Sequence, residues 1–290
     1  MSINNSTGSS TGNGISPQSI VVAGCGAMGY PMALQLLDHG HTVSGFDVRP
    51  TATLLPENSS ASPFPFLTTL DDLSAEQILW VVVRDEAEIT ALCFDEQAVF
   101  RQAQYPSTVV ISSTVSPRYI HRLNELLPTN VTLIDAPMSG APYAAKAGTL
   151  TFMVGGSTDA IGAIRPCLDA MGNHVHHVGP VGAGMLIKVM NNYVAAASVV
   201  AVRRSLDRAA ANGVDSDLLL TIMSQSSGAT WYGDHANEIE WAQQHYDPAN
   251  TIGILEKDVQ CSLGTDLVTT DAFDQALLLA LKQLPHWPKR

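Results

Sequence analysis

The fold is decided by the stretch Ser19-Ile-Val-Val-Ala-Gly24-Cys-Gly26-Ala-Met-Gly29-Tyr-Pro-Met-Ala-Leu34. A β-branched strand pattern runs into three glycines, spaced Gly-x-Gly-x-x-Gly, and an apolar helical pattern follows. In this order the first glycine makes a tight turn and the second lets a pyrophosphate approach the backbone. The third glycine lets the helix pack against the strand. The stretch therefore predicts a dinucleotide-binding unit, whose phosphate-facing residues are Gly24, Gly26, Ala27, Met28 and Gly29.

A second strand pattern begins at Thr42 and ends in an acid, Asp47. A carboxylate at this position can accept hydrogen bonds from the adenine ribose hydroxyls and would repel a 2′-phosphate, which favours NAD over NADP. Arg49 lies two residues further on and could hold that phosphate, so we expect NADP to be tolerated. The alternative role for Asp47 is that of a turn residue before Pro50.

Further strand patterns occupy residues 78–83, 108–112 and 131–135, and helical patterns occupy residues 85–94 and 117–127. This alternation is typical of a doubly wound sheet. The sequence predicts an α/β protein in which a Rossmann domain over residues 19–181 precedes an all-helical domain over residues 182–290. Residues 1–18 are rich in Ser, Thr, Asn and Gly, which predicts a disordered tail.

Composition narrows the class of protein. The chain has 290 residues, of which 46% are hydrophobic and 14% charged, and its formal net charge is −12. This charge disfavours nucleic acid and anionic membranes as partners, and we expect no apolar run long enough to span a bilayer. The four cysteines contain no Cys-x-x-Cys pair, which indicates reduced thiols in a cytoplasmic protein.

Residues 182–192, Gly182-Ala-Gly184-Met-Leu-Ile-Lys188-Val-Met-Asn191-Asn192, open a long apolar helix that runs toward Asn212. Lys188 and Asn192 stand at i and i+4, so their side chains share one face. The apolar neighbours of Lys188 disfavour its charged form and lower its pKa toward a range useful for proton transfer. An ordinary surface pair is the alternative interpretation.

Residues 135–140, Asp-Ala-Pro-Met-Ser139-Gly140, follow the last predicted strand of the parallel series. Small residues here leave backbone N–H groups free, and the Ser139 hydroxyl is an additional donor. Ser139 and Gly140 could therefore cup a carboxylate, although a tight turn would give the same pattern.

Four motifs occur in the order found in one known family: Gly24-x-Gly26-x-x-Gly29, Ser113-Thr114-Val115, Asp135-Ala-Pro-Met-Ser139-Gly140, and Gly182-x-Gly184-x-x-x-Lys188-x-x-Asn191-Asn192. A fifth, Lys257-Asp258, lies in the C-terminal part. Over residues 19–265 the chain resembles the β-hydroxyacid dehydrogenases, which include 3-hydroxyisobutyrate, tartronate semialdehyde, glyoxylate/succinic semialdehyde and threonate enzymes.

The resemblance implies an NAD(P)-dependent oxidoreductase that transfers a hydride between cofactor and a small 3-hydroxy acid or its semialdehyde. It also implies pairing with a second subunit, as a homodimer or homotetramer. It assigns Lys188 as the general acid/base. The residues it assigns to the substrate are Asn192, Ser139 and Gly140, and those it assigns to the cofactor include Thr114 and Lys257.

Departures from the family pattern leave two alternatives open. Arg84 replaces a small or uncharged residue close to the expected cofactor, and the chain after Lys257 is shorter than usual. The alternatives are an imine reductase-like NADPH enzyme on the same fold and a catalytically weak NAD(P)-binding interaction protein.

No metal site is expected, because the closely spaced His174, His176 and His177 alternate along an apparent strand. For Tyr143, Trp231 and Tyr232 we expect packing in the core.

Overall fold

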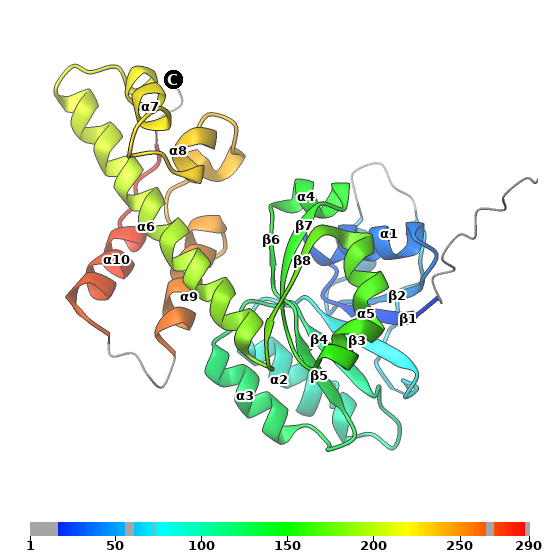
Figure 1. The fold of residues 1–290 in the computed structure, drawn as a ribbon. Coiled ribbons are helices and arrows are strands. Elements are labelled where there is room, and N and C mark those ends of the chain that lie inside the picture. Colours follow the sequence, from blue (N-terminus) through cyan, green and yellow to red (C-terminus); the bar gives the residue numbers. More distant parts are fainter. Residues whose placement is uncertain (1–16, 56–60, 72, 265–269, 288–290) are drawn as a thin grey trace, which may run out of the picture.

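A computed structural model describes residues 17–55, 61–71, 73–264 and 270–287 (Figure 1). Most of the predicted disordered tail lies outside these residues. The eight-stranded sheet has the order β2-β1-β3-β4-β5-β7-β6, and β8 also pairs with β7. Its strands are β1 Ser19–Ala23, β2 Thr42–Phe46, β3 Gln77–Val81, β4 Thr108–Ile111, β5 Thr132–Asp135, β6 Met138–Ser139, β7 Leu150–Gly155 and β8 Gly172–Gly179. The strands β1 to β5 are parallel, whereas β7 runs antiparallel to β5 and β6.

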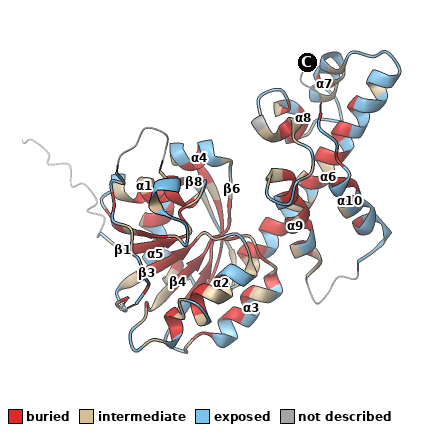
Figure 2. Ribbon diagram, turned by 180° about the vertical axis from the view of Figure 1, so that it is seen from behind, coloured by how far each residue is buried: buried red, intermediate tan, exposed pale blue. Residues whose placement is uncertain are grey.

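The central strands are buried on both faces, because helices cover the sheet on either side (Figure 2). Ile20 and Val22 of β1 face one hydrophobic core, and Val21 and Ala23 face the other, as the two-residue period of a strand requires. The helices of this part are α1 Gly29–Asp38, α2 Glu86–Phe94, α3 Pro117–Leu126, α4 Pro142–Ala147 and α5 Thr158–Met171. The predicted strands and helices of the doubly wound sheet are confirmed.

Side-chain caps explain where the helices begin. The Asp85 carboxylate accepts from Glu88 N at 3.0 Å ahead of α2, and Ser116 Oγ accepts from Tyr119 N at 3.2 Å ahead of α3. Such caps satisfy backbone donors that have no partner inside the helix. α1 differs, because no side chain caps its first turn. In this turn the Tyr30 N–H donates to the Gly26 carbonyl at 3.1 Å and Pro31 has no N–H, so the helix begins directly from the glycine motif.

The helix α6, Ala183–Ala211, joins the sheet to a helical region. Its first turn packs against the sheet, and the rest extends away from it and lies among the later helices (Figure 1). Those helices are α7 Ser216–Ser224, α8 Trp231–His235, α9 Thr251–Leu263 and α10 Ala272–Lys282. Short 3₁₀ helices span Thr51–Thr53, Val99–Arg101 and Glu240–Gln243. In the described ranges no strand follows β8. The prediction of a Rossmann domain followed by a helical region is therefore confirmed.

The length of α6 corrects one expectation. With 29 residues and a mean hydropathy of 1.5 over its most apolar window, it is long and apolar enough to cross a membrane. The expectation that no apolar run has this length was wrong. Val199, Val202 and Leu206 of α6 are nevertheless buried in the core of the helical region, together with residues of α8, α9 and α10. This packing is that of a central core helix.

Candidate active site

The three glycines of the first motif differ in what their Cα atoms face. A Cβ on Gly24, whose φ is +94°, would overlap the Val82 carbonyl, and a Cβ on Gly29 would overlap the Gly24 carbonyl. The protein's own packing therefore requires both glycines. A Cβ on Gly26 would meet only the Arg49 guanidinium, at 3.1 Å. Packing does not explain Gly26, so its missing side chain fits a group that approaches the loop from outside, such as a pyrophosphate.

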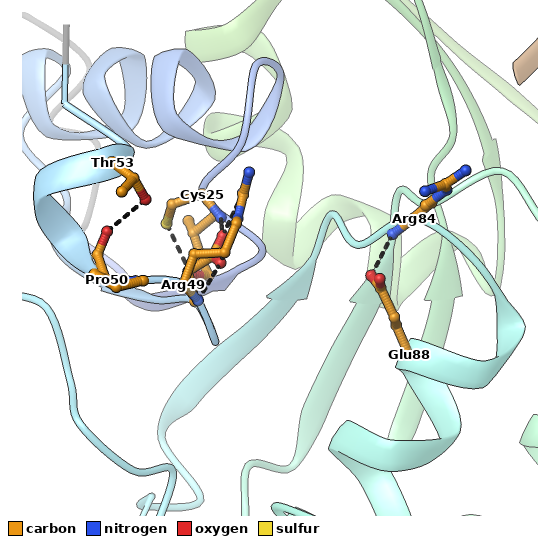
Figure 3. A network of polar contacts seen from close by, with 8 residues as sticks. Cys25, Arg49, Pro50, Thr53, Arg84 and Glu88 are labelled. Atoms are coloured by element: carbon orange, nitrogen blue, oxygen red, sulfur yellow. Dashed lines mark hydrogen bonds and ion pairs between the residues drawn. The ribbon is translucent and has the colours of Figure 1, made fainter. Parts of the chain in front are cut away.

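Asp47 follows β2 and lies against this loop. Its Oδ2 accepts from Cys25 N at 2.9 Å and from the Arg49 guanidinium at 2.8 Å, and its Oδ1 accepts from Arg49 Nε at 2.9 Å (Figure 3). Burial alone would raise the pKa of Asp47, but the hydrogen bonds from Arg49 and Cys25 outweigh it and hold the pKa below its ordinary value. Asp47 is therefore a carboxylate fixed beside the glycine loop, and Arg49 covers it.

The buried carboxylate of Asp135 fixes the start of α6. From the sequence, Asp135 was predicted only to end a strand. Its Oδ1 accepts from Gly182 N and its Oδ2 from Met185 N, both at 2.7 Å. A Cβ on Gly155 would overlap this carboxylate, and one on Gly184 would overlap the Met153 carbonyl. Burial raises the pKa of Asp135 to about 6, although these hydrogen bonds oppose the rise. The only hint in the sequence was an acid at a strand end paired with glycines about 50 residues later.

Lys188 is buried, with 8% of its surface exposed, one turn beyond this anchored start. In the part of the chain that the structure describes, no hydrogen-bond acceptor contacts its ammonium group. Burial lowers the pKa of Lys188, the nearby charge of Asp258 opposes that change, and Lys257 adds to it. The burial of Lys188 and the lowered direction of its pKa agree with the prediction, whereas Ile187 and Met190 beside it are 40% or more exposed.

Asp258, on α9, contacts two of the predicted residues. Its Oδ2 accepts from Asn192 Nδ2 at 2.6 Å, and its Oδ1 lies 2.8 Å from Lys257 Nζ. Lys257 Nζ also donates to the Thr114 carbonyl at 2.6 Å, which joins α9 to the loop after β4. Asp258 is almost fully buried. In the sequence Asp258 stands beside Lys257, and no role was predicted for it.

Ser139 and Gly140 lie at the end of β6, where Ser139 pairs with Thr151 of β7. Gly140 has φ +133°, and a Cβ there would lie 2.9 Å from both Ala144 and Leu150, so the turn requires glycine. Within the described residues the Ser139 hydroxyl has no hydrogen-bond partner and remains available as a donor. In the described part of the chain, no hydrogen bond or ion pair joins these two residues to the group around Asp258.

A cavity of about 390 Å³ lies where α9 meets the loop after β4. It is lined by Asp85, Glu86, Ala87, Thr114, Val115, Ser116, Lys257, Gln260, Cys261 and Gly264. It therefore contains two of the predicted cofactor residues, Thr114 and Lys257. A second cavity, of about 400 Å³ near Phe94, Phe100 and Leu126, contains none of the predicted site residues.

The remaining expectations had mixed outcomes. Among the described residues no three His, Cys, Asp or Glu side chains cluster as metal ligands would. His174 and His176 lie on β8, as predicted, with their rings 6.4 Å apart.

Tyr232 is buried as expected, but Tyr143 and Trp231 are more than half exposed. The expectation of core packing was wrong for these two, because α4 and α8 turn them toward solvent.

Comparison with known proteins shows which protein families the chain matches. Residues 19–179 match the NAD binding domain of 6-phosphogluconate dehydrogenase, and residues 182–272 match the family described as NAD-binding of NADP-dependent 3-hydroxyisobutyrate dehydrogenase. The chain is 33% identical to a 3-hydroxyisobutyrate dehydrogenase and 31% identical to an NAD-dependent L-serine dehydrogenase, both from Pseudomonas aeruginosa. Each alignment covers 73% of this chain and 71% of the relative.

A solved structure agrees with these matches. The Mycobacterium tuberculosis 3-hydroxyisobutyrate dehydrogenase with L-serine superposes with a TM-score of 0.74 at 26% identity. The superposition covers 91% of this chain and 92% of that one. Fold, glycine loop and relatives together define an NAD(P)-dependent dehydrogenase that acts on a small hydroxy acid. The chain belongs to the β-hydroxyacid dehydrogenase family.

Proposed function

We propose that Lys188 is the general acid/base of this dehydrogenase and that its substrate is a small 3-hydroxy acid or the corresponding semialdehyde. The observation that carries this proposal is a buried ammonium group without a hydrogen-bond acceptor among the described residues. A lysine of lowered pKa loses its proton more readily than an ordinary lysine, and the neutral amine is the form that takes a proton. When bound, NAD(P) accepts or returns the hydride of the carbinol carbon. Lys188 Nζ takes the hydroxyl proton in oxidation and supplies a proton to the carbonyl oxygen in reduction.

Asn192, Ser139 and Gly140 are proposed to hold the substrate. Asn192 donates to Asp258, so its side chain has a fixed orientation one turn from Lys188. The Ser139 hydroxyl and the Gly140 N–H lie together on a turn at the end of β6 and suit a carboxylate. Asp258 is proposed to set the position of Asn192 and, through its charge, to limit the decrease in the pKa of Lys188.

For the cofactor we infer a preference for NAD with some tolerance of NADP. The glycine loop, the uncapped start of α1, Thr114 and Lys257 are the residues proposed to hold the dinucleotide. Support for NAD comes from Asp47, whose fixed carboxylate suits ribose hydroxyls and disfavours a 2′-phosphate. The tolerance of NADP is proposed to come from Arg49. Its guanidinium is half exposed and could exchange its ion pair with Asp47 for one with the 2′-phosphate.

The test is turnover of NAD and NADP with a panel of small 3-hydroxy acids, including 3-hydroxyisobutyrate and L-serine. We expect oxidation of at least one panel member, faster with NAD than with NADP. A protein that binds NADH but oxidises none of the panel would contradict the proposed substrate class. Reduction of a cyclic imine under the same conditions would favour the imine reductase alternative.

We also propose that the protein pairs with a second copy of itself through α6. Leu186, Ile187, Met190 and Val194 are each 40% or more exposed and lie along one side of this helix. A contiguous apolar face of this kind is typical of a protein–protein interface. The sedimentation mass should be that of a dimer or tetramer, and Val194→Glu should lower it. A monomeric unmutated protein would contradict the proposal.

Two further expectations remain proposals. We infer a domain boundary at residues 181–182, because β8 ends at Gly179 and α6 begins at Ala183. We also propose a cytoplasmic location, which is consistent with the free thiols Cys25, Cys93, Cys167 and Cys261.

A further inference from the structure

Arg84 follows the carboxyl end of β3, which ends at Val81. The residues just before Arg84 pack directly against the glycine loop, because a Cβ on Gly24 would overlap the Val82 carbonyl and lie 3.0 Å from Val83. In Figure 3, Arg84 projects from the same edge of the sheet as Cys25 and Arg49. Arg84 therefore puts a cation at the edge of the sheet that carries the glycine loop, where the phosphates of a dinucleotide are expected.

The cationic side chains near this edge differ in whether a carboxylate pairs with them. Arg49 is held by both oxygens of Asp47, and Lys257 lies 2.8 Å from the Asp258 carboxylate. The Arg84 guanidinium instead donates to a neutral group, the Pro248 carbonyl, at 2.7 Å. Glu88 accepts from the backbone N of Arg84, and the guanidinium points away from it (Figure 3). Among the described residues, no carboxylate is in ion-pair contact with the Arg84 guanidinium.

The partner of Arg84 belongs to the helical region. Pro248 precedes α9, whose N-cap is Asn250, and Gly253 in the first turn of α9 lies so close to Pro248 that a Cβ there would be 2.7 Å from the Pro248 Cα. The same helix carries Lys257 and Asp258. The Arg84–Pro248 hydrogen bond therefore fastens the start of α9 to the edge of the NAD-binding domain.

We propose that Arg84 is a cofactor-binding residue that exchanges the Pro248 carbonyl for the pyrophosphate of the dinucleotide. The exchange gains a charged acceptor in place of a neutral one, and hydrogen bonds between two charged groups are the stronger kind. The backbone of the glycine loop at Gly26 carries no charge, so Arg84 adds positive charge to a chain whose net charge is −12. Since Pro248 then loses its donor, cofactor binding also releases the start of α9. The inference rests on dinucleotide binding and does not depend on the identity of the substrate.

The test compares ligands that share or lack the pyrophosphate. Isothermal titration with ADP-ribose and with AMP is performed on the unmutated protein, Arg84→Ala and Arg84→Lys. The control is Arg165→Ala, because Arg165 is an exposed arginine of α5 paired with Asp169. We expect Arg84→Ala to weaken ADP-ribose binding at least about tenfold and AMP binding less than about twofold. Arg84→Lys should fall between, and Arg165→Ala should match the unmutated protein.

Two results would overturn the proposal. One is ADP-ribose binding that Arg84→Ala leaves unchanged, and the other is an equal loss for AMP and ADP-ribose, which would mean that Arg84 acts only through the fold. Amide hydrogen exchange supplies a second measurement, in which cofactor-free Arg84→Ala should exchange faster over residues 251–257 than the unmutated protein. Failure of the proposed substrate class would appear separately, as absent turnover by an unmutated protein that still binds ADP-ribose.

Discussion

The glycine loop and the surroundings of Lys188 are built in different ways. In the loop, backbone atoms touch backbone atoms: Gly24 lies against Val82, and Gly29 lies against Gly24. Around Lys188, two buried carboxylates reach across the fold, with Asp135 holding the start of α6 and Asp258 holding Asn192 and Lys257. A motif of consecutive residues describes the first kind of site, whereas in the second Asp135 and Asn192 have partners 47 to 66 residues away in the chain.

The largest expected effect is at Lys188. Lys188→Ala should lower kcat by roughly 10² to 10⁴, the usual contribution of one acid/base group. Lys188→Arg should be almost as inactive, because a guanidinium does not release its proton near neutral pH. Both variants should bind NADH normally by fluorescence titration, since the nucleotide is held at the other part of the site. An arginine variant that keeps most of its activity would mean that positive charge alone suffices.

The pH dependence of the unmutated enzyme sharpens the same point. Oxidation needs the neutral amine of Lys188, and its pKa is lowered by burial. The rate of oxidation should therefore rise with pH through that lowered pKa and level off below the ordinary range of a lysine. The profile of kcat/KM against pH measures this. A rise that continues to the ordinary pKa of a lysine would contradict the role of burial.

Asp135 should make folding stability depend on pH. Its pKa is raised from 3.8 to about 6 in the folded protein, so the folded state binds the proton more tightly than the unfolded chain. The stabilisation is complete below the unfolded pKa and is lost as pH rises toward 6, by about 3 kcal/mol in total. Asp135→Asn should lack this decrease in urea unfolding between pH 4 and 7. Parallel curves for the two proteins would show that Asp135 does not titrate as described.

The glycine loop allows a matched pair of substitutions. Gly26→Ala should leave the melting temperature nearly unchanged, since only the flexible Arg49 guanidinium is close, yet weaken NADH binding by about tenfold or more. Gly29→Ala should lower the melting temperature, because its Cβ overlaps the Gly24 carbonyl. Equal melting temperatures and equal affinities for the two variants would remove the distinction between packing and ligand approach.

The smallest effect is expected in the choice of cofactor. Asp47→Ala should shift preference toward NADP, because it removes a carboxylate that repels the 2′-phosphate and frees Arg49 to bind it. The ratio of kcat/KM for NAD and NADP measures the shift, which we expect to be about tenfold. If the unmutated protein already bound NADPH tenfold more tightly than NADH, the assignment of Asp47 would be wrong.

The sequence by itself determined the Rossmann domain and the long helix α6. It also determined that Lys188 and Asn192 are neighbours on one face of this helix. These features follow from local geometry, because the periods of strands and helices and the sterics of glycine act over a few residues. It also predicted a lowered pKa for Lys188, but the burial that lowers the pKa comes from packing, because Ile187 and Met190 beside it are 40% or more exposed.

Only the tertiary structure decided how that lysine is held. Asp135, Asp258 and Arg84 act on groups that the chain brings together from distant positions, and a single sequence has no period or spacing that marks such pairs. The exposure of Tyr143 and Trp231 was misjudged for the same reason, because burial depends on which elements pack over a side chain. Local sterics are encoded in neighbouring residues, whereas long-range hydrogen bonds and burial exist only after the chain has folded.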